Sequence, residues 1–128
     1  MHSFTCLVYY EDTDMAGIVY YANYLKFIER ARSEWVRSLG VDQGKLKDED
    51  GIVFAVRRVE ADYLRSAVFD DELTITTEMK SLSPARIILE QIVRRESDVV
   101  FQADVTLVAM TENGKPTRLP SVFRQFLA

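Results

Sequence analysis

The residues best suited to chemistry lie in the segment 9–24, which reads YYEDTDMAGIVYYANY. It places an acidic tripeptide, Asp12-Thr13-Asp14, beside a lone Gly17 and a dense group of aromatic side chains. Carboxylates normally lie in water and aromatic side chains normally do not, so the combination indicates a carboxylate at the mouth of an apolar pocket. That arrangement is more typical of an active site than of a packed core. A carboxylate placed there can act as a nucleophile or as a general base for water.

The acidic tripeptide also has two simpler explanations. Asp and Thr favour turns and helix caps, so the three residues could serve only the backbone. The other explanation, a calcium-binding loop, is excluded. Counted from Asp12, the fifth residue is Ala16 and the twelfth is Asn23, where such a loop needs Asp or Asn and then Glu. We expect Asn23 to hold the loop by hydrogen bonds of its side chain.

Histidine and cysteine chemistry has little support. His2 is the only histidine, and its terminal position predicts an exposed side chain rather than the base of a Ser-His-Asp or Cys-His mechanism. Cys6 is the only cysteine, so no intrachain disulfide can form, and we expect it to be a small buried residue of the first strand. The sequence has neither metal-ligand spacing nor a glycine-rich phosphate loop, so we expect no metal site.

The periodicity of apolar residues predicts the elements that position this segment. Alternation over residues 4–10 predicts a short strand. Apolar residues at three- and four-residue steps from Tyr24 to Leu39 predict one long helix that ends at Gly40. The polar and charged segment 42–51 is expected to be an exposed connection. Four strand-like stretches follow, at residues 52–59, 73–79, 87–93 and 99–110.

The gaps between these stretches predict their arrangement. Residues 81–84 and 96–98 are turn-sized, which forces the strands they join to be antiparallel, and Asn113-Gly114 is a strong tight-turn signal. Residues 122–127 are expected to form a final helical turn. The result is a single α+β domain over residues 1–128, with a strand, a long helix and an antiparallel meander of about four strands. One helix cannot cover a five-stranded sheet, so apolar strand edges should remain, which predicts a homo-oligomer.

Composition limits the partners and the location. The formal net charge of −4 argues against general nucleic-acid binding. No apolar run is long enough to cross a bilayer, and the short apolar stretch 6–10 ends at Glu11 and Asp12, so we expect no signal peptide. Together with the single cysteine, these features favour a cytoplasmic location.

The same residues resemble a known family. The run 9–32, YYEDTDMAGIVYYANYLKFIERAR, together with FDDEL at residues 69–73 and the Lys115-Pro116 and Leu119-Pro120 pairs, is similar to the 4-hydroxybenzoyl-CoA thioesterase branch of the hotdog-fold superfamily. Within that branch the chain looks most like the Tol-Pal-associated acyl-CoA thioesterases of bacteria. The resemblance covers essentially the whole chain. It implies a hotdog fold, in which a five-stranded antiparallel sheet wraps one long helix, and hydrolysis of acyl-CoA to free acid and CoA.

The resemblance also implies roles for individual residues. Asp14 corresponds to the catalytic carboxylate of the family, as nucleophile or general base, which leaves turn and cap roles to Asp12 and Thr13. The backbone N–H of Tyr21, at the start of the helix, corresponds to the donor that polarises the thioester carbonyl. Relatives form dimers whose sheets join edge to edge, and usually tetramers, with the active site at a subunit interface, so a homodimer or homotetramer is expected. Coenzyme A is part of the substrate, and no cofactor is expected.

Five further residues are expected to contact the substrate. Gly17 would let the backbone approach it closely. Tyr20 and Tyr24 would line the acyl pocket, and Arg65 and Arg86 are candidates for binding the CoA phosphates.

Departures from the family pattern leave the substrate open. The Tol-Pal-associated enzymes often carry His at the position of Tyr21, whereas 4-hydroxybenzoyl-CoA thioesterases carry an aromatic residue, so short aliphatic and aromatic acyl groups both remain. Ser66 stands where relatives often have Pro, near the thioester. A non-catalytic alternative is a hotdog protein that binds acyl-CoA or acyl-carrier protein near the inner membrane, but an intact Asp14 favours the enzyme. A hotdog hydratase is disfavoured because it pairs His with Asp, and this chain has no interior His.

Overall fold

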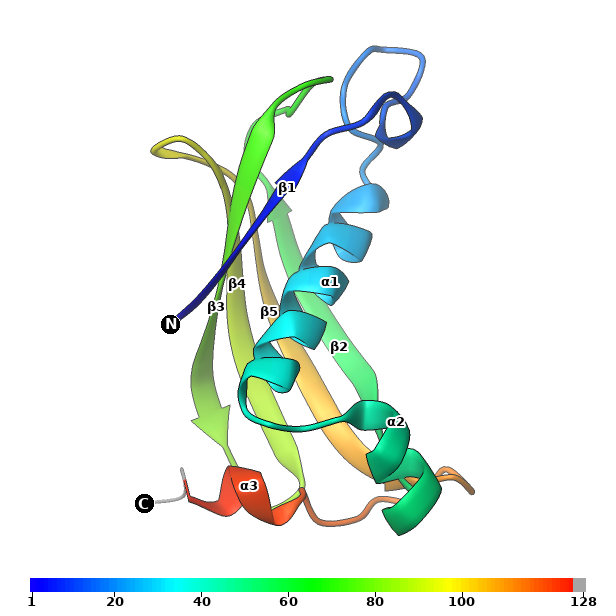
Figure 1. Cartoon of the computed structure of the whole chain (residues 1–128). Coiled ribbons are helices and arrows are strands. Elements are labelled where there is room, and N and C mark those ends of the chain that lie inside the picture. The colour runs from blue at the N-terminus through cyan, green and yellow to red at the C-terminus, as the bar shows by residue number, and fades with distance from the viewer. Residues whose placement is uncertain (126–128) are drawn as a thin grey trace.

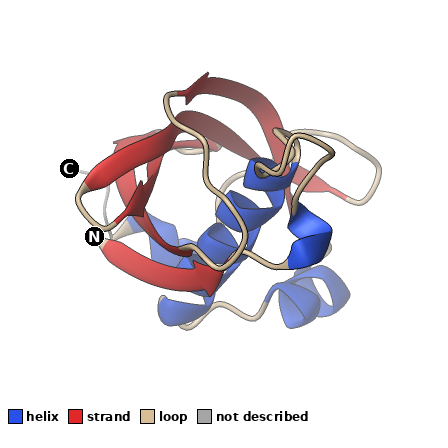
Figure 2. Ribbon diagram, turned by 90° about the horizontal axis from the view of Figure 1, so that it is seen from above, coloured by secondary structure: helices blue, strands red, loops and turns tan. Residues whose placement is uncertain are grey.

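Five antiparallel strands form one sheet, and the long helix α1 lies across its inner face (Figure 1). Figure 2 shows from above how the sheet curves around that helix. The structure is a computed structural model and describes residues 1–125. Along the chain its elements are β1 (His2–Leu7), the 3-10 turn η1 (Tyr10–Asp12), α1 (Asn23–Ser38), α2 (Gln43–Lys45), the π-helical turn η2 (Leu46–Asp50), β2 (Ile52–Tyr63), β3 (Glu72–Leu82), β4 (Arg86–Arg95), β5 (Asp98–Thr111) and α3 (Ser121–Arg124). This α+β arrangement confirms the architecture expected from the sequence.

The strands are ordered β1-β3-β4-β5-β2, and every neighbouring pair is antiparallel. β3, β4 and β5 form the expected meander. The prediction that β2 also belongs to it is wrong, because β2 pairs with β5 instead of β3. Residues 64–71 explain the difference, since this connection is too long for a hairpin turn and lets β3 pair with β1 on the other side. β1 and β2 are therefore the two edges of the sheet.

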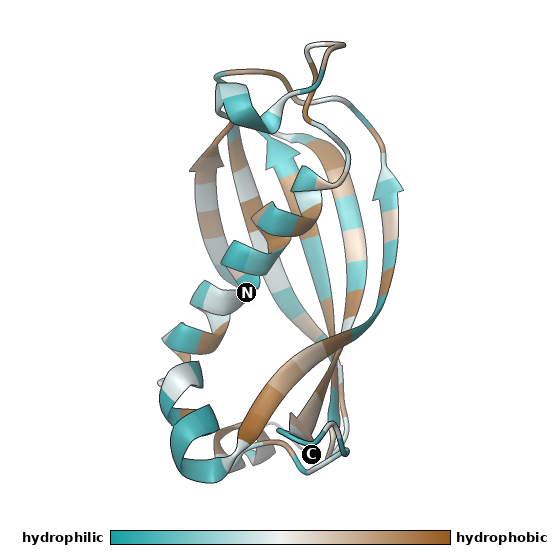
Figure 3. Cartoon of the chain, turned by 90° about the vertical axis from the view of Figure 1, so that its right-hand side faces the viewer, coloured by the Kyte–Doolittle hydropathy of each residue, from teal (hydrophilic) through white to brown (hydrophobic). Residues whose placement is uncertain are grey.

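The helix α1 buries one face against the sheet, as its apolar spacing predicted. Its buried residues are Tyr24, Phe27, Ile28, Ala31, Trp35 and Val36. Apart from the exposed Leu25, hydrophilic residues occupy the side of α1 that faces away from the sheet (Figure 3). The helix ends beside Gly40, also as predicted, and glycine adopts the φ of +84° found there at little energetic cost.

Two details differ from the sequence prediction. The connection 42–51 is exposed for most of its length, as expected, but it also forms α2 and η2, which were not predicted. Asp42 caps this helical segment, because its Oδ1 accepts a hydrogen bond from the Lys45 N–H at 3.1 Å. The expectation that His2 is exposed is wrong, since His2 pairs with Thr77 through β1 and is half-buried.

The C-terminal part follows the prediction where the structure describes it. The tight turn at Asn113-Gly114 is present, with the Gly114 N–H donating to the Thr111 oxygen at 2.8 Å. α3 begins the predicted final helical turn, and positions 126–127 of that prediction lie outside the described residues. None of the helices within residues 1–125 combines the length and the apolar character needed to cross a membrane.

Gln91 of β4 is a fully buried polar side chain in the core. Its Nε2 donates to the Ile28 oxygen of α1 at 2.9 Å and to the Thr77 Oγ1 of β3 at 3.0 Å. Its Oε1 accepts a hydrogen bond from the Arg32 Nη1 at 3.1 Å. Both polar atoms of the amide are thus bonded, as burial requires, and α1 is fixed at a defined rotation on the sheet.

Candidate active site

The acidic loop, residues 11–19, leaves the end of β1 and returns to the core. Thr13 and Val19 form an isolated antiparallel bridge, and the Asp14 N–H donates to the Ile18 oxygen over 2.9 Å. The turn closes through the Gly17 N–H, which donates to the main-chain oxygen of Asp14 at 2.9 Å, and Gly17 has a φ of +82°. Glycine adopts that backbone conformation readily and other residues do not, so Gly17 makes the tight return that presents Asp14.

Asp14 is half-buried as a residue, and its carboxylate uses one oxygen for the turn. Its Oδ1 accepts a hydrogen bond from the Ala16 N–H at 2.9 Å, which stabilises the loop. Within residues 1–125, Oδ2 has no hydrogen-bond partner. Asp14 lines an open hollow of about 580 Å³ together with Tyr10, Thr13, Met15, Gly17 and Phe69. One carboxylate oxygen is therefore available at a hollow whose lining is largely apolar.

Asp12 and Thr13 serve the backbone, as predicted. The Asp12 Oδ2 accepts the Tyr9 N–H at 2.8 Å, and the Thr13 Oγ1 donates to the Tyr10 oxygen at 2.7 Å. The predicted supporting role of Asn23 is also confirmed, since its Nδ2 donates to the main-chain oxygen of Asp12 at 2.9 Å. These bonds tie the acidic loop to the end of β1 and to the start of α1.

The start of α1 presents free main-chain donors. Ala22 is the N-cap residue, and no side chain caps this end of the helix. The Asn23 N–H is bonded to the Tyr20 oxygen at 2.8 Å, but the described chain offers no acceptor for the N–H of Tyr21 or Ala22. These donors lie at the positive end of the helix dipole, where they can bind an anion or an oxyanion. The Tyr21 N–H is available for the role predicted for it, and that role stays a prediction.

An aromatic cluster lies beside the helix start. The ring centroids of Tyr20 and Tyr21 are 4.9 Å apart, and Tyr21 meets Tyr63 edge-on at 6.0 Å. Deeper in the fold, Tyr63 contacts Tyr24 and Phe101, whose own rings stack at 5.0 Å. Tyr20, Tyr21 and Tyr63 remain exposed at the outer end of the cluster. The cluster thus forms an aromatic wall that runs from the surface into the core.

Tyr63 is a member of this cluster that the sequence pattern did not predict. The pattern predicts a strand that ends at Val59, whereas β2 continues to Tyr63, which pairs with Phe101 of β5. Val59, Ala61 and Tyr63 alternate along one face of β2, and this alternation was the signal that could have revealed the residue. Burial raises the pKa of Tyr63 and of Tyr24, so both are neutral phenols at neutral pH. They can line a pocket but do not supply a phenolate base.

The two predicted phosphate-binding arginines lie at opposite ends of the sheet. Arg65 is exposed just after β2, at the end that carries the acidic loop, and its main-chain N–H donates to the main-chain oxygen of Val100 at 3.1 Å. Arg86 begins β4 at the other end, where it lines a separate hollow of about 410 Å³ with residues of β2 and β5. Within one chain the fold does not bring these two side chains together. In the part of the chain that the structure describes, no group of three or more His, Cys, Asp or Glu side chains is placed to hold a metal ion.

Known proteins resemble this chain in both sequence and structure. A family described as the Thioesterase superfamily matches residues 16–102. The acyl-CoA thioesterase YbgC of Haemophilus influenzae is 42% identical over 113 residues, which cover 88% of this chain and 82% of the relative. The crystal structure of a probable thioesterase from Bartonella henselae superposes with a TM-score of 0.90 and 39% identity, over 93% of this chain and 98% of that one. The structure of BH1999, a gentisyl-coenzyme A thioesterase, has a TM-score of 0.89 and 26% identity, over 95% of this chain and 98% of that one.

A curved five-stranded sheet around one long helix is the hotdog fold, and the relatives that share it are named thioesterases. The family match includes α1 and most of the sheet, and the sequence identity to the Haemophilus protein extends over most of both chains. The chain belongs to the thioesterase superfamily. The prediction that it is an enzyme of this class is confirmed.

Proposed function

We propose that the protein hydrolyses acyl-CoA thioesters to a free acid and CoA, with Asp14 as the catalytic carboxylate. The observation that carries the proposal is the free Oδ2 of Asp14 at a largely apolar hollow. Family membership supports the reaction class, and the Haemophilus relative is named an acyl-CoA thioesterase. A protein that only bound the thioester would need no free carboxylate beside it.

In the proposed reaction the Asp14 Oδ2 attacks the thioester carbonyl carbon, the C–S bond breaks and CoA leaves as the thiolate. Water then hydrolyses the mixed anhydride, which releases the acid and restores Asp14. In the alternative mechanism Asp14 is a general base and water attacks directly. In both, the Tyr21 N–H donates to the developing oxyanion, and loss of one such donor typically costs about 3–4 kcal/mol of transition-state stabilisation.

A second copy of the chain completes the site in this proposal. The exposed apolar side chains Val56, Val59 and Tyr63 lie on the edge strand β2, and Leu64 follows them. Two β2 edges could pair antiparallel and join two sheets into one, which would cover this edge. Because Tyr63 belongs to the aromatic cluster, the acyl pocket would then lie at the subunit boundary. Sedimentation should show a homodimer or homotetramer, and a monomer at assay concentrations would contradict this part of the proposal.

The proposed acyl group is short-chain or aromatic. The exposed rings of Tyr20 and Tyr21 can contact an aromatic acyl group, and the structural relative BH1999 is named a gentisyl-coenzyme A thioesterase. Gly17 would allow the close approach of the thioester, and Tyr24 would form the floor of the pocket. Arg65 is the candidate for the CoA phosphates at the Asp14 end, whereas Arg86 could reach them only in an assembly.

We also propose that the protein belongs to the 4-hydroxybenzoyl-CoA thioesterase branch and is most like its Tol-Pal-associated members. It would act in the cytoplasm and hydrolyse the thioester without a cofactor. Acyl-carrier protein is the alternative carrier of the acyl group, and CoA or the carrier protein would enter the reaction as part of the substrate.

Thiol release from a panel of short, long and aromatic acyl-CoAs tests the proposal, with the wild type compared to Asp14→Asn. The Asn Oδ1 can still accept the Ala16 N–H, so the variant should keep the wild-type circular dichroism spectrum and lose turnover. Asp48→Asn, which removes an exposed carboxylate from η2, is the matched control and should keep full activity. Acyl-CoA binding without turnover by the wild type would favour the non-catalytic alternative. Turnover that survives Asp14→Asn would show that another group is catalytic.

A further inference from the structure

The crossover, residues 64–71, connects β2 to β3 and supports the acidic loop from one side. The Val19 N–H donates to the Ala67 oxygen at 2.8 Å, and Ile18 forms an antiparallel bridge with Val68. The Ile18 oxygen in turn accepts the N–H of the proposed catalytic residue at 2.9 Å. Because main-chain bonds connect the crossover to the acidic loop, a shift of the crossover would also move Asp14, the proposed catalytic residue.

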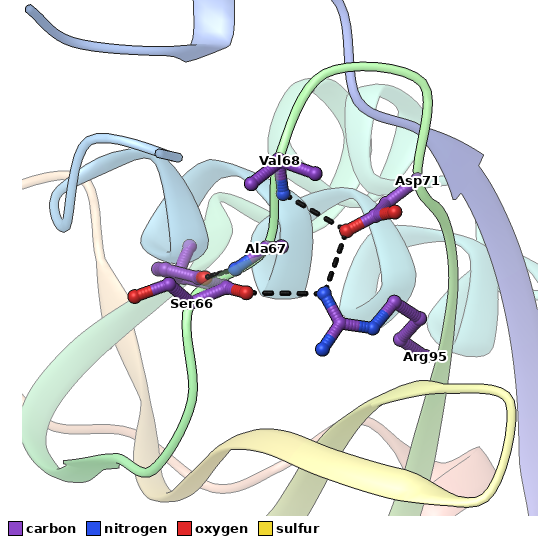
Figure 4. A network of polar contacts seen from close by, with 6 residues as sticks. Ser66, Ala67, Val68, Asp71 and Arg95 are labelled. Atoms are coloured by element: carbon purple, nitrogen blue, oxygen red, sulfur yellow. Dashed lines mark hydrogen bonds and ion pairs between the residues drawn. The ribbon is translucent and has the colours of Figure 1, made fainter. Parts of the chain in front are cut away.

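Arg95, at the end of β4, holds the crossover in place (Figure 4). Its Nη1 donates to the main-chain oxygen of Ser66 at 3.1 Å and to the Asp71 Oδ2 at 2.8 Å. The same Oδ2 accepts the Val68 N–H at 2.9 Å. The Arg95 Nη1 and the Asp71 Oδ2 thus link Ser66, near the start of the crossover, to Asp71 at its end.

The Arg95–Asp71 ion pair is less exposed to solvent than the Lys80–Asp104 pair. The side chains of Arg95 and Asp71 are 30% and 19% exposed, against 53% and 31% for Lys80 and Asp104, a pair with the same N–O distance of 2.8 Å. The hydrogen bond to Asp71 raises the pKa of Arg95, so the guanidinium keeps its charge. Asp70, beside the pair, has a φ of +71°, a left-handed conformation that Asp adopts more readily than most residues other than glycine.

We propose that Arg95 is a positioning residue for Asp14 and acts through Asp71 and the crossover. The inference rests on the proposed function of Asp14. Removing the guanidinium leaves the Asp71 carboxylate without its counter-charge and the Ser66 oxygen without its donor, so the crossover relaxes and the acidic loop loses its support. Displacement of a catalytic group by about 1 Å can lower a rate by roughly a hundredfold, so a small relaxation is measurable as a change in kcat.

Arg95→Met and Arg95→Lys test the proposal in the full chain, with Lys80→Met as the matched control. Lys80→Met also removes one cation of an ion pair, but it lies near the other end of β3. Arg95→Met should lower kcat by about tenfold or more, with KM changed much less, because the carboxylate is displaced while the substrate pocket remains. Arg95→Lys keeps a cation for Asp71 and should recover most of that loss. Lys80→Met should leave kcat and KM unchanged.

Amide hydrogen exchange, measured without substrate, provides the second readout. The N–H groups of Asp14 and Val19 depend on the support of the crossover and should exchange faster in Arg95→Met, but not in Lys80→Met. Hydrogen exchange tests whether Arg95 supports the acidic loop even if the wild type shows no turnover. A lack of turnover would overturn only the proposed function. Should Arg95→Met fail to fold, Asp71→Asn replaces it, because the Asn oxygen still accepts the Val68 N–H and only the charge is lost.

Three results would overturn the proposal. The first is an unchanged exchange of the Asp14 and Val19 amides in Arg95→Met. The second is a loss of kcat in Arg95→Met that Lys80→Met reproduces, which would mark a general loss of stability. The third is an Arg95→Lys variant no better than Arg95→Met, which would show that the ion pair with Asp71 does not carry the effect.

Discussion

The side-chain amide of Asn23 donates a hydrogen bond to the main-chain oxygen of Asp12 over 2.9 Å. The same oxygen accepts the Tyr20 N–H at 2.9 Å, so one carbonyl group joins the acidic loop to the start of α1. The loop carries the proposed catalytic carboxylate, and the helix start carries the proposed oxyanion donor. These two hydrogen bonds therefore help to set the spacing between the carboxylate and the oxyanion donor.

Asn23→Ala should lower the free energy of unfolding by about 1 kcal/mol, because one partly buried hydrogen bond is lost. We also expect a fall in kcat of roughly tenfold, since the loop can move relative to the helix. Asn23→Asp has nearly the same size but no N–H donor, and its charge suits a helix N-terminus, so stability should fall less while kcat falls equally. Urea denaturation and thiol release measure the two effects. Wild-type kcat in both variants would show that this bond does not set the spacing.

The role of Gly17 in the acidic loop can be tested against Gly40, which follows α1 and has a similar backbone conformation. Their φ values are +82° and +84°, and a Cβ added to either would meet no atom within 4 Å. Alanine at either site should therefore lower stability by a similar amount, about 1–2 kcal/mol, through backbone strain rather than a clash. Gly17→Ala should also lower kcat, because Gly17 closes the turn that presents Asp14, whereas Gly40→Ala should not. Equal kcat values for the two variants would contradict the placement of Gly17 in the site.

Local elements of the fold could be predicted because each leaves a pattern within a few residues. The apolar spacing of α1 and the alternation of β3, β4 and β5 are such patterns, and they predicted the helix and three strands closely. The pairing of β2 with β5 leaves no local signal, because it depends on the burial of the whole sheet. The helical turns within 42–51 were missed for a different reason, since a polar segment has no apolar face whose period could reveal a helix.

In the candidate site, too, the residues that lie close together in the sequence could be predicted and those joined only by the fold could not. One segment, residues 9–24, contains Asp14, Gly17 and Tyr21. Its acidic and aromatic composition indicates an active site, so these three residues could be predicted from the sequence. Arg95 and Asp71 lie 24 residues apart, and although Asp71 belongs to the FDDEL motif, nothing in the sequence links it to Arg95. Only the fold brings them together at the crossover, and for that reason their connection to the acidic loop could not be predicted.

Gln91→Leu should lower the free energy of unfolding by about 2–3 kcal/mol. Leucine fills a similar volume but leaves the Arg32 guanidinium, whose pKa burial lowers, without its acceptor. Thr77→Val removes only the hydroxyl that accepts one Gln91 N–H and should cost about 1 kcal/mol. The double variant Arg32→Met/Gln91→Leu removes both polar partners and should be more stable than the sum of the single losses predicts. Strict additivity in urea denaturation would contradict this account of the network.

The Cys6 thiol should react slowly until the pH approaches its raised pKa. Burial raises that pKa from 9.0 to about 11, while Arg30 opposes the shift and Asp12 adds to it. Near neutral pH the native protein should therefore be alkylated by iodoacetamide roughly a hundredfold more slowly than the urea-unfolded chain. Because the native thiol resists ionisation, it stabilises the fold below pH 9, and this contribution is lost as the pH rises from 9 through 11. Cys6→Ala should accordingly lose less stability over that window, and equal alkylation rates in the native and unfolded chains would show that water reaches the thiol freely.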